Sequence, residues 1–131
     1  MSLFNNLFGG SNSASSELPE FWRKLETLEE LQSAIEKSSE KTIVIFKHST
    51  RCIISKTVLR NFEKEIEQNQ NNDIEFYYLD LLNYRNISNE IAGNLHVTHQ
   101  SPQVIVIKNQ QAIYNASHDG ISLESILKNI L

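Results

Sequence analysis

The chain has 131 residues, with 12 basic and 16 acidic side chains and a formal net charge of -4 at pH 7. This acidic balance lacks the basic footprint of a nucleic-acid-binding protein, and the apolar runs are too short to cross a membrane. A single cysteine excludes an internal disulfide and is typical of a reducing compartment, so we expect a cytoplasmic protein.

The first seventeen residues are rich in serine, asparagine and glycine. They lack the basic start and the long apolar core of a signal peptide. We therefore expect a flexible tail over residues 1–17 and a single domain over residues 18–131. A domain of that length buries about two-thirds of its extended-chain surface and needs no disulfide to fold.

Apolar periodicity predicts strands and helices in alternation through the first half of this domain. Residues 21–25 are expected to form a short edge strand. Thr27 and Glu30 have the spacing of a capping box, which begins a helix. A β-branched apolar run over residues 42–47 predicts a buried strand. The next helix is expected over residues 52–68, with an apolar stripe made by Ile54, Val58, Phe62 and Ile66.

The second half continues this alternation and closes on a hairpin. Residues 74–80 predict a strand, residues 83–95 a helix, and residues 103–108 and 111–115 the two arms of the hairpin. Ser122 is expected to cap the last helix. The order β-α-β-α-β-α-β-β-α indicates the α/β class, with parallel pairing and an antiparallel edge.

Cys52 is predicted to lie where the buried strand passes into the second helix. A thiolate is the nucleophilic form of cysteine, and the unpaired N–H groups of a helix N-terminus favour negative charge there. Arg51 and Lys47 add positive charge, and the Ser55 hydroxyl is placed one turn along to donate to the sulfur. Since Ser55 stands where a dithiol enzyme has its second cysteine, the chain cannot resolve a mixed disulfide internally.

Pro102 directly precedes the apolar strand at residues 103–108. In this order of elements we expect a cis Ser101–Pro102 bond beside the thiol, where it presents backbone groups for strand-like pairing with a disulfide substrate. The alternative is an ordinary trans proline at the start of a strand.

The four histidines are expected to hold no metal. Only His96 and His99 are close in sequence, and with one cysteine a zinc site is not expected. His99 lies just before Pro102, and His118 lies between the last strand and the last helix. Both loops should surround the thiol, where either imidazole would take up a proton or bind an acidic thiol ligand. A solvated loop histidine is the alternative for each.

Three segments in this order resemble the YtxJ-type monothiol bacilliredoxins of the thioredoxin-like superfamily. They are residues 46–55 (FKHSTRCIIS), Ser101-Pro102-Gln103 preceded by His99, and Ser117-His118 before the last helix. The resemblance runs from about Pro19 to the C-terminus. It implies a thioredoxin-like three-layer α/β/α sandwich with a mixed sheet.

The resemblance also implies an activity, which is removal of the low-molecular-weight thiol bacillithiol from mixed disulfides on cytosolic proteins. Cys52 would attack the bacillithiol sulfur and hold bacillithiol as a mixed disulfide, which a second bacillithiol or a partner reductase would then reduce. Bacillithiol would be a co-substrate, with no bound cofactor, and we expect a monomer. The residues expected to contact the substrate are Thr50, Arg51, Ser55, His99, Ser101, Pro102 and His118.

One departure from the resemblance is Ile53, which stands where a proline often follows the cysteine. Ile53 keeps its N–H group, which proline would remove, and it places an apolar β-branched side chain beside the sulfur.

Three other functions stay open. The first is a monothiol glutaredoxin-like protein that uses glutathione or an iron–sulfur cluster, although its Cys-Gly-Phe-Ser pattern is absent at residues 52–55. The second is a non-catalytic binding module whose groove near Pro102 holds a peptide. The third is a thiol-based stress sensor, in which Cys52 accepts a small thiol and this alters partner binding.

Overall fold

The computed structural model describes residues 18–69 and 73–130, so the tail expected over residues 1–17 lies outside the described residues. The elements are β1 (Trp22–Lys24), α2 (Leu28–Lys37), β2 (Thr42–His48), α3 (Ile53–Gln68), β3 (Ile74–Asp80), α4 (Arg85–Asn94), β4 (Gln103–Lys108), β5 (Gln111–Ser117), the 3₁₀ turn η2 (His118–Gly120) and α5 (Leu123–Ile130). The predicted alternation of strands and helices is confirmed. No helix of the described segments is long and apolar enough to span a membrane.

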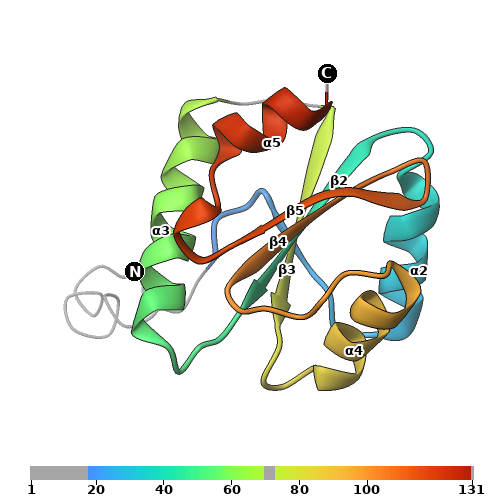
Figure 1. Cartoon of the computed structure of the whole chain (residues 1–131), viewed down its shortest axis with the longest axis horizontal. Helices are drawn as coiled ribbons and strands as arrows, with labels where there is room; N and C mark the ends of the chain where they lie inside the picture. The colour runs from blue at the N-terminus through green and yellow to red at the C-terminus, as the bar shows by residue number, and fades with distance from the viewer. Residues whose placement is uncertain (1–17, 70–72, 131) are drawn as a thin grey trace, which may run out of the picture.

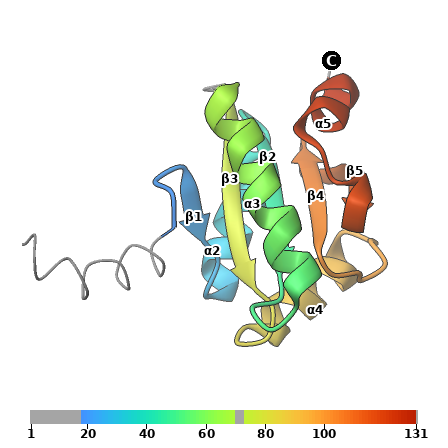
Figure 2. The same cartoon turned by 90° about the vertical axis from the view of Figure 1, so that its left-hand side faces the viewer.

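The strands form one mixed sheet in the order β1-β3-β2-β4-β5. β1 and β2 run parallel to β3, whereas β4 runs antiparallel to both β2 and β5. Helices α3 and α5 cover one face of the sheet, and α2 and α4 cover the other (Figures 1 and 2). This arrangement confirms the predicted three-layer α/β/α sandwich.

The central strand β2 is buried along its whole length. Ile43 and Ile45 belong to the core beneath α2 and α4, while Val44 and Phe46 belong to the core beneath α3 and α5. Side chains alternate between the two faces of a strand, and here helices cover both faces. Residues 43–46 of the strand are therefore a continuous apolar run rather than an alternating pattern.

The predicted caps of α2 and α5 are confirmed. Glu30 N–H donates to Thr27 Oγ at 3.0 Å, and Thr27 N–H donates to Glu30 Oε1 at 3.1 Å, which is the reciprocal pair of a capping box. At α5, Ser125 N–H donates to Ser122 Oγ at 3.1 Å. These local hydrogen bonds satisfy N–H groups that a helix start leaves unpaired.

The hairpin between β4 and β5 turns without glycine. Asn109 and Gln110 both adopt left-handed backbone angles, with φ of 52° and 66°, as a two-residue hairpin turn of type I′ requires. Both residues are tied to Ser38 at the end of α2, through Asn109 N–H to its carbonyl and Gln110 N–H to its hydroxyl, each at 2.8 Å. These two tertiary hydrogen bonds stabilise the left-handed backbone angles, which glycine would adopt without such help.

The prediction that Ile54 joins the buried stripe of α3 is wrong, because Ile54 is 60% exposed. Phe62 and Ile66 are buried as expected, and the third buried residue of the helix is Ser55. At 3.6 residues per turn, a face centred on Phe62 and Ile66 includes Ser55 and leaves Ile54 on its flank. The first turn of α3 therefore presents apolar surface to solvent.

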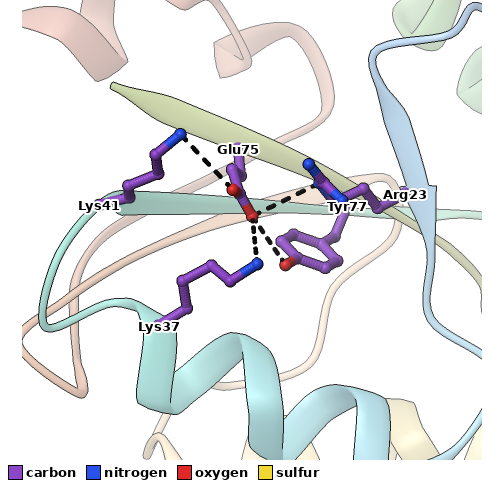
Figure 3. Close-up of polar contacts among 5 residues, drawn as sticks. All are labelled: Arg23, Lys37, Lys41, Glu75 and Tyr77. Carbon is purple, nitrogen blue, oxygen red and sulfur yellow. Dashed lines mark hydrogen bonds and ion pairs between the residues drawn. The ribbon is translucent and has the colours of Figure 1, made fainter. Parts of the chain in front are cut away.

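A cluster of charged side chains around Glu75 lies at the edge of the sheet, at the end remote from Cys52 (Figure 3). The carboxylate of Glu75 accepts a hydrogen bond from Tyr77 Oη at 3.0 Å and pairs with Arg23 and Lys37 at 3.4 Å and with Lys41 at 3.6 Å. Burial alone would raise the pKa of this carboxyl group, but the tyrosine hydroxyl and the cations outweigh burial and hold the pKa below its ordinary value. The cluster joins β1, β3, the last residue of α2 and the segment between α2 and β2.

We expect Glu75→Gln to lower the free energy of unfolding at pH 7 by roughly 1–3 kcal/mol, because three cations lose their shared anion. In the wild-type protein, the Glu75 carboxylate contributes to the free energy of unfolding above the ordinary glutamate pKa of about 4.3. This contribution is lost as the pH falls through the lower pKa of Glu75 in the folded state. Urea unfolding between pH 7 and pH 3 measures both effects, and the variant should lack this part of the pH dependence.

Glu124→Gln is the matched control. It breaks the 3.6 Å pair with Lys128 on α5, whose two side chains are 80% and 73% exposed. An exposed pair of this kind contributes about 0–1 kcal/mol. Equal losses in the two variants would contradict a stabilising role for the Glu75 cluster.

Candidate functional site

Cys52 is the N-cap residue of α3 and follows the end of β2 by four residues. Its carbonyl accepts from Lys56 N–H at 3.0 Å, and its own N–H donates to Ser49 O at 3.2 Å. The thiol is partly exposed and makes no capping hydrogen bond to the helix within the described residues. The N-cap position places Cys52 at the start of α3, where the unpaired N–H groups of the first turn favour negative charge, and its partial exposure leaves the thiol open to a substrate.

Ser55 lies one turn beyond Cys52 and is completely buried. Its hydroxyl lies 2.8 Å from His48 Nδ1 and accepts from Ser49 N–H at 3.1 Å. These contacts fix the loop that carries Cys52 by joining the end of β2 to the first turn of α3. The hydroxyl faces the protein interior, so its expected contact with a ligand stays a prediction.

His48 is a buried residue to which sequence reasoning gave no role. Burial lowers the pKa of its imidazole, with Asp80 opposing this effect and Lys56 adding to it. The ring is therefore neutral near pH 7, which suits a buried hydrogen-bond partner of Ser55. The signal available in the sequence was the polar pair Lys47 and His48 at the end of an apolar run.

The side chain of Lys47 lies on the opposite face of β2 from that of His48 and is completely buried. Its Nζ lies 3.4 Å from Ser88 O in α4 and 3.3 Å from His99 Nδ1. Burial lowers the pKa of this ammonium group to about 8. Its contacts thus run to α4 and to His99, whereas the sequence placed its charge with the thiol.

The loop before β4 is held by a buried glutamine. Gln103 Nε2 donates to Thr98 O at 3.0 Å, and Gln103 Oε1 accepts from Gln100 N–H at 3.3 Å. Gln103 also pairs with Lys47 across the antiparallel β2–β4 ladder. The start of β4 therefore lies at the same end of the sheet as the end of β2 and the start of α3 (Figure 1).

The peptide bond between Ser101 and Pro102 is cis, and the Pro102 carbonyl accepts from His118 N–H at 3.0 Å. This bond joins the loop before β4 to the turn after β5. His118 is exposed and has a left-handed backbone, with φ of 55°. The structure thus brings together Pro102 and the backbone of His118.

The remaining predicted contact residues differ in exposure. Thr50 and Arg51 are exposed in the turn that leads to Cys52, His99 is exposed, and Ser101 is half-buried. Their contacts with a substrate stay predictions. Among residues 18–69 and 73–130, no group of three or more His, Cys, Asp or Glu side chains is placed to hold a metal ion.

We expect Ser55→Ala to lower the free energy of unfolding by about 1–3 kcal/mol, because Ser49 N–H and His48 Nδ1 lose a buried partner. The matched control is Thr57→Ala, an exposed position on the same helix, where the change should stay within about 0.5 kcal/mol. Urea unfolding measures both variants. A Ser55→Ala loss no larger than that of the control would show that the hydroxyl does not brace the loop.

Comparison with known proteins agrees with this fold. The family model of monothiol bacilliredoxin BrxC matches residues 23–126. A solved structure described as a candidate oxidoreductase with a thioredoxin fold is 28% identical with a TM-score of 0.74, over 86% of this chain and 96% of that chain.

Two thioredoxins support the fold alone. The reduced thioredoxin pre-protein of Schistosoma mansoni is 21% identical with a TM-score of 0.67, over 84% of this chain and 98% of its own. Mitochondrial thioredoxin 3 of Saccharomyces cerevisiae is 24% identical with a TM-score of 0.62, over 81% of this chain and 92% of its own. The monothiol bacilliredoxin model matches residues 23–126, which is more than half of the chain, so the predicted resemblance is confirmed and the chain belongs to the monothiol bacilliredoxin family.

Proposed function

We propose that this protein is a monothiol thiol–disulfide oxidoreductase that removes bacillithiol from S-bacillithiolated cytosolic proteins. One observation carries the proposal. The only cysteine of the chain is a partly exposed N-cap residue of α3, and the position one turn along holds a buried serine. The site therefore offers one nucleophile and no internal thiol to resolve its mixed disulfide.

The reaction is an exchange of one disulfide for another. The Cys52 thiolate attacks the bacillithiol sulfur of the protein mixed disulfide, and a new bond forms between Cys52 and bacillithiol. The protein thiolate leaves and takes a proton from solvent. A second bacillithiol thiolate then attacks the bound bacillithiol sulfur, which releases bacillithiol disulfide and returns Cys52 to its reduced state. No step requires a cofactor.

The surface beside Cys52 fits a protein as the substrate. Ile53 and Ile54 are 77% and 60% exposed and lie next to the cysteine. Neighbouring exposed apolar side chains are typical of a surface that contacts another protein. We propose that these isoleucines contact the thiolated protein, while the loops at His99, Pro102 and His118 contact the small thiol.

An intact-mass experiment tests the proposed transfer. The reduced protein is mixed with one model protein carrying bacillithiol and, separately, with the same protein carrying glutathione. We expect the bacillithiol adduct to move to Cys52 faster than the glutathione adduct, and Cys52→Ser should accept neither. Equal transfer of both adducts would contradict selectivity for bacillithiol. Transfer no faster than in Cys52→Ser would contradict the enzymatic role and favour a binding module.

We expect Ile54→Ser to slow transfer from a bacillithiolated protein by roughly tenfold, since a central apolar contact contributes about 1–2 kcal/mol to a protein interface. Transfer from the small disulfide of bacillithiol with a chromogenic thiol should change much less. The matched control is Leu28→Ser, because Leu28 is 45% exposed on α2, which covers the face of the sheet opposite α3. If Leu28→Ser slowed transfer as much as Ile54→Ser, the isoleucine would have no special role in docking.

A further inference from the structure

Lys47 and His99 form a contact that has no part in the proposed exchange reaction as described above. They are 52 positions apart in sequence, and Lys47 Nζ lies 3.3 Å from His99 Nδ1. Ser88 Oγ lies 3.4 Å from the same nitrogen, and Ser88 O lies 3.4 Å from Lys47 Nζ. Two buried residues thus surround one nitrogen of an exposed imidazole.

The chemistry of the lysine determines the role of the histidine nitrogen. A charged ammonium group has only donors, so a ring nitrogen that meets it must be the acceptor and must carry no proton. In a neutral imidazole the proton is then on Nε2. The buried lysine makes no ion pair among the described residues. The polar groups that its ammonium group contacts there are His99 Nδ1 and the Ser88 carbonyl.

The Nε2 side of His99 is the side available to a ligand. No hydrogen bond to Nε2 is seen within the described residues, and His99 is exposed in the loop that leads to Pro102. Burial, Lys47 and Arg85 together lower the pKa of His99, so the ring is neutral near pH 7. The charges of Lys47 and Arg85 both act on the ring and give this part of the loop a positive potential, which favours an anionic ligand.

We propose that Lys47 is a positioning residue that holds His99 in its Nε2–H tautomer, so that His99 donates one hydrogen bond to an anionic group of the small-thiol moiety of the substrate. This inference rests on the proposed thiol exchange at Cys52 and specifies the class of thiol that the site takes. A carboxylate is the acceptor that best fits a neutral donor flanked by cations. Lys47 acts only through His99, because its own side chain is completely buried.

The positioning step is tested by ¹⁵N NMR of the histidine rings, which needs no catalysis. In the wild-type protein, His99 should carry its proton on Nε2 alone at pH 7 and titrate below the ordinary histidine value of about 6.5. In Lys47→Met, a variant of similar length, the His99 midpoint should rise and the ring should sample both tautomers. The thermal unfolding curve checks that Lys47→Met folds.

Lys56→Met is the matched control for loss of a lysine charge. Lys56 lies near His48, so its removal should shift the titration of His48 and leave that of His99 unchanged. A wild-type His99 that carries its proton on Nδ1, or a midpoint unaffected by Lys47→Met, would overturn the positioning role whatever the enzymatic activity.

The ligand class is tested with two simple probes on one model protein, 3-mercaptopropionate as an anionic adduct and cysteamine as a cationic adduct. We expect the wild-type protein to remove the anionic adduct roughly tenfold faster than the cationic one. His99→Asn, whose amide reaches only the Nδ1 position, should abolish this preference. His99→Gln, whose amide nitrogen reaches the Nε2 position, should restore most of it.

The outcomes separate the inference from the proposed function. A preference for the anionic probe that depends on His99, without transfer of bacillithiol, would support the inference and contradict bacillithiol as the substrate. Transfer of bacillithiol with no preference between the two probes, or with a preference unchanged in His99→Asn, would overturn the anionic site and leave the proposed function standing.

Discussion

Helices cover both faces of β2, and the pleat of this strand sends its last two side chains in opposite directions. Lys47 enters the layer beneath α4, and His48 enters the layer beneath α3. Each is buried and polar, so each needs a partner, because an unpaired buried polar group costs about 1–3 kcal/mol. Their partners are the residues that shape the two loops at the thiol end of the sheet.

The buried side chains of His48 and Lys47 are accommodated differently on the two faces of the sheet. His48 is kept neutral, and its ring meets the Ser55 hydroxyl in the first turn of α3. Lys47 is a cation in an interior that disfavours charge, and among the described residues it meets a backbone carbonyl and an imidazole rather than a carboxylate. A buried cation without an anion stabilises a fold poorly. The position of Lys47 at the end of β2 is therefore easier to understand through His99, the exposed residue that it contacts.

The sequence predicted those features that depend on local chain geometry. The capping pair Thr27 and Glu30 and the position of Cys52 at a helix start follow from spacings of a few residues. The contact of Lys47 with His99 spans 52 positions, and periodicity along a single element contains no information about such a pair. The misplacement of Ile54 has the same origin, since spacing of four gives a stripe but does not say which flank the sheet covers.

The site has a single thiol because the chain has one cysteine, and the contacts of Ser55 also favour a serine over a second cysteine one turn along α3. The serine oxygen accepts from a backbone N–H group and also meets an imidazole nitrogen, at 3.1 Å and 2.8 Å. A thiol at this position is a weaker donor and a weaker acceptor, and its larger sulfur would have to fit a completely buried site. Adding a second cysteine here would weaken the contacts that hold the loop of Cys52. The loop is thus built around a hydroxyl. In the exchange that we propose, reduction of the Cys52 mixed disulfide therefore falls to a thiol from outside the chain.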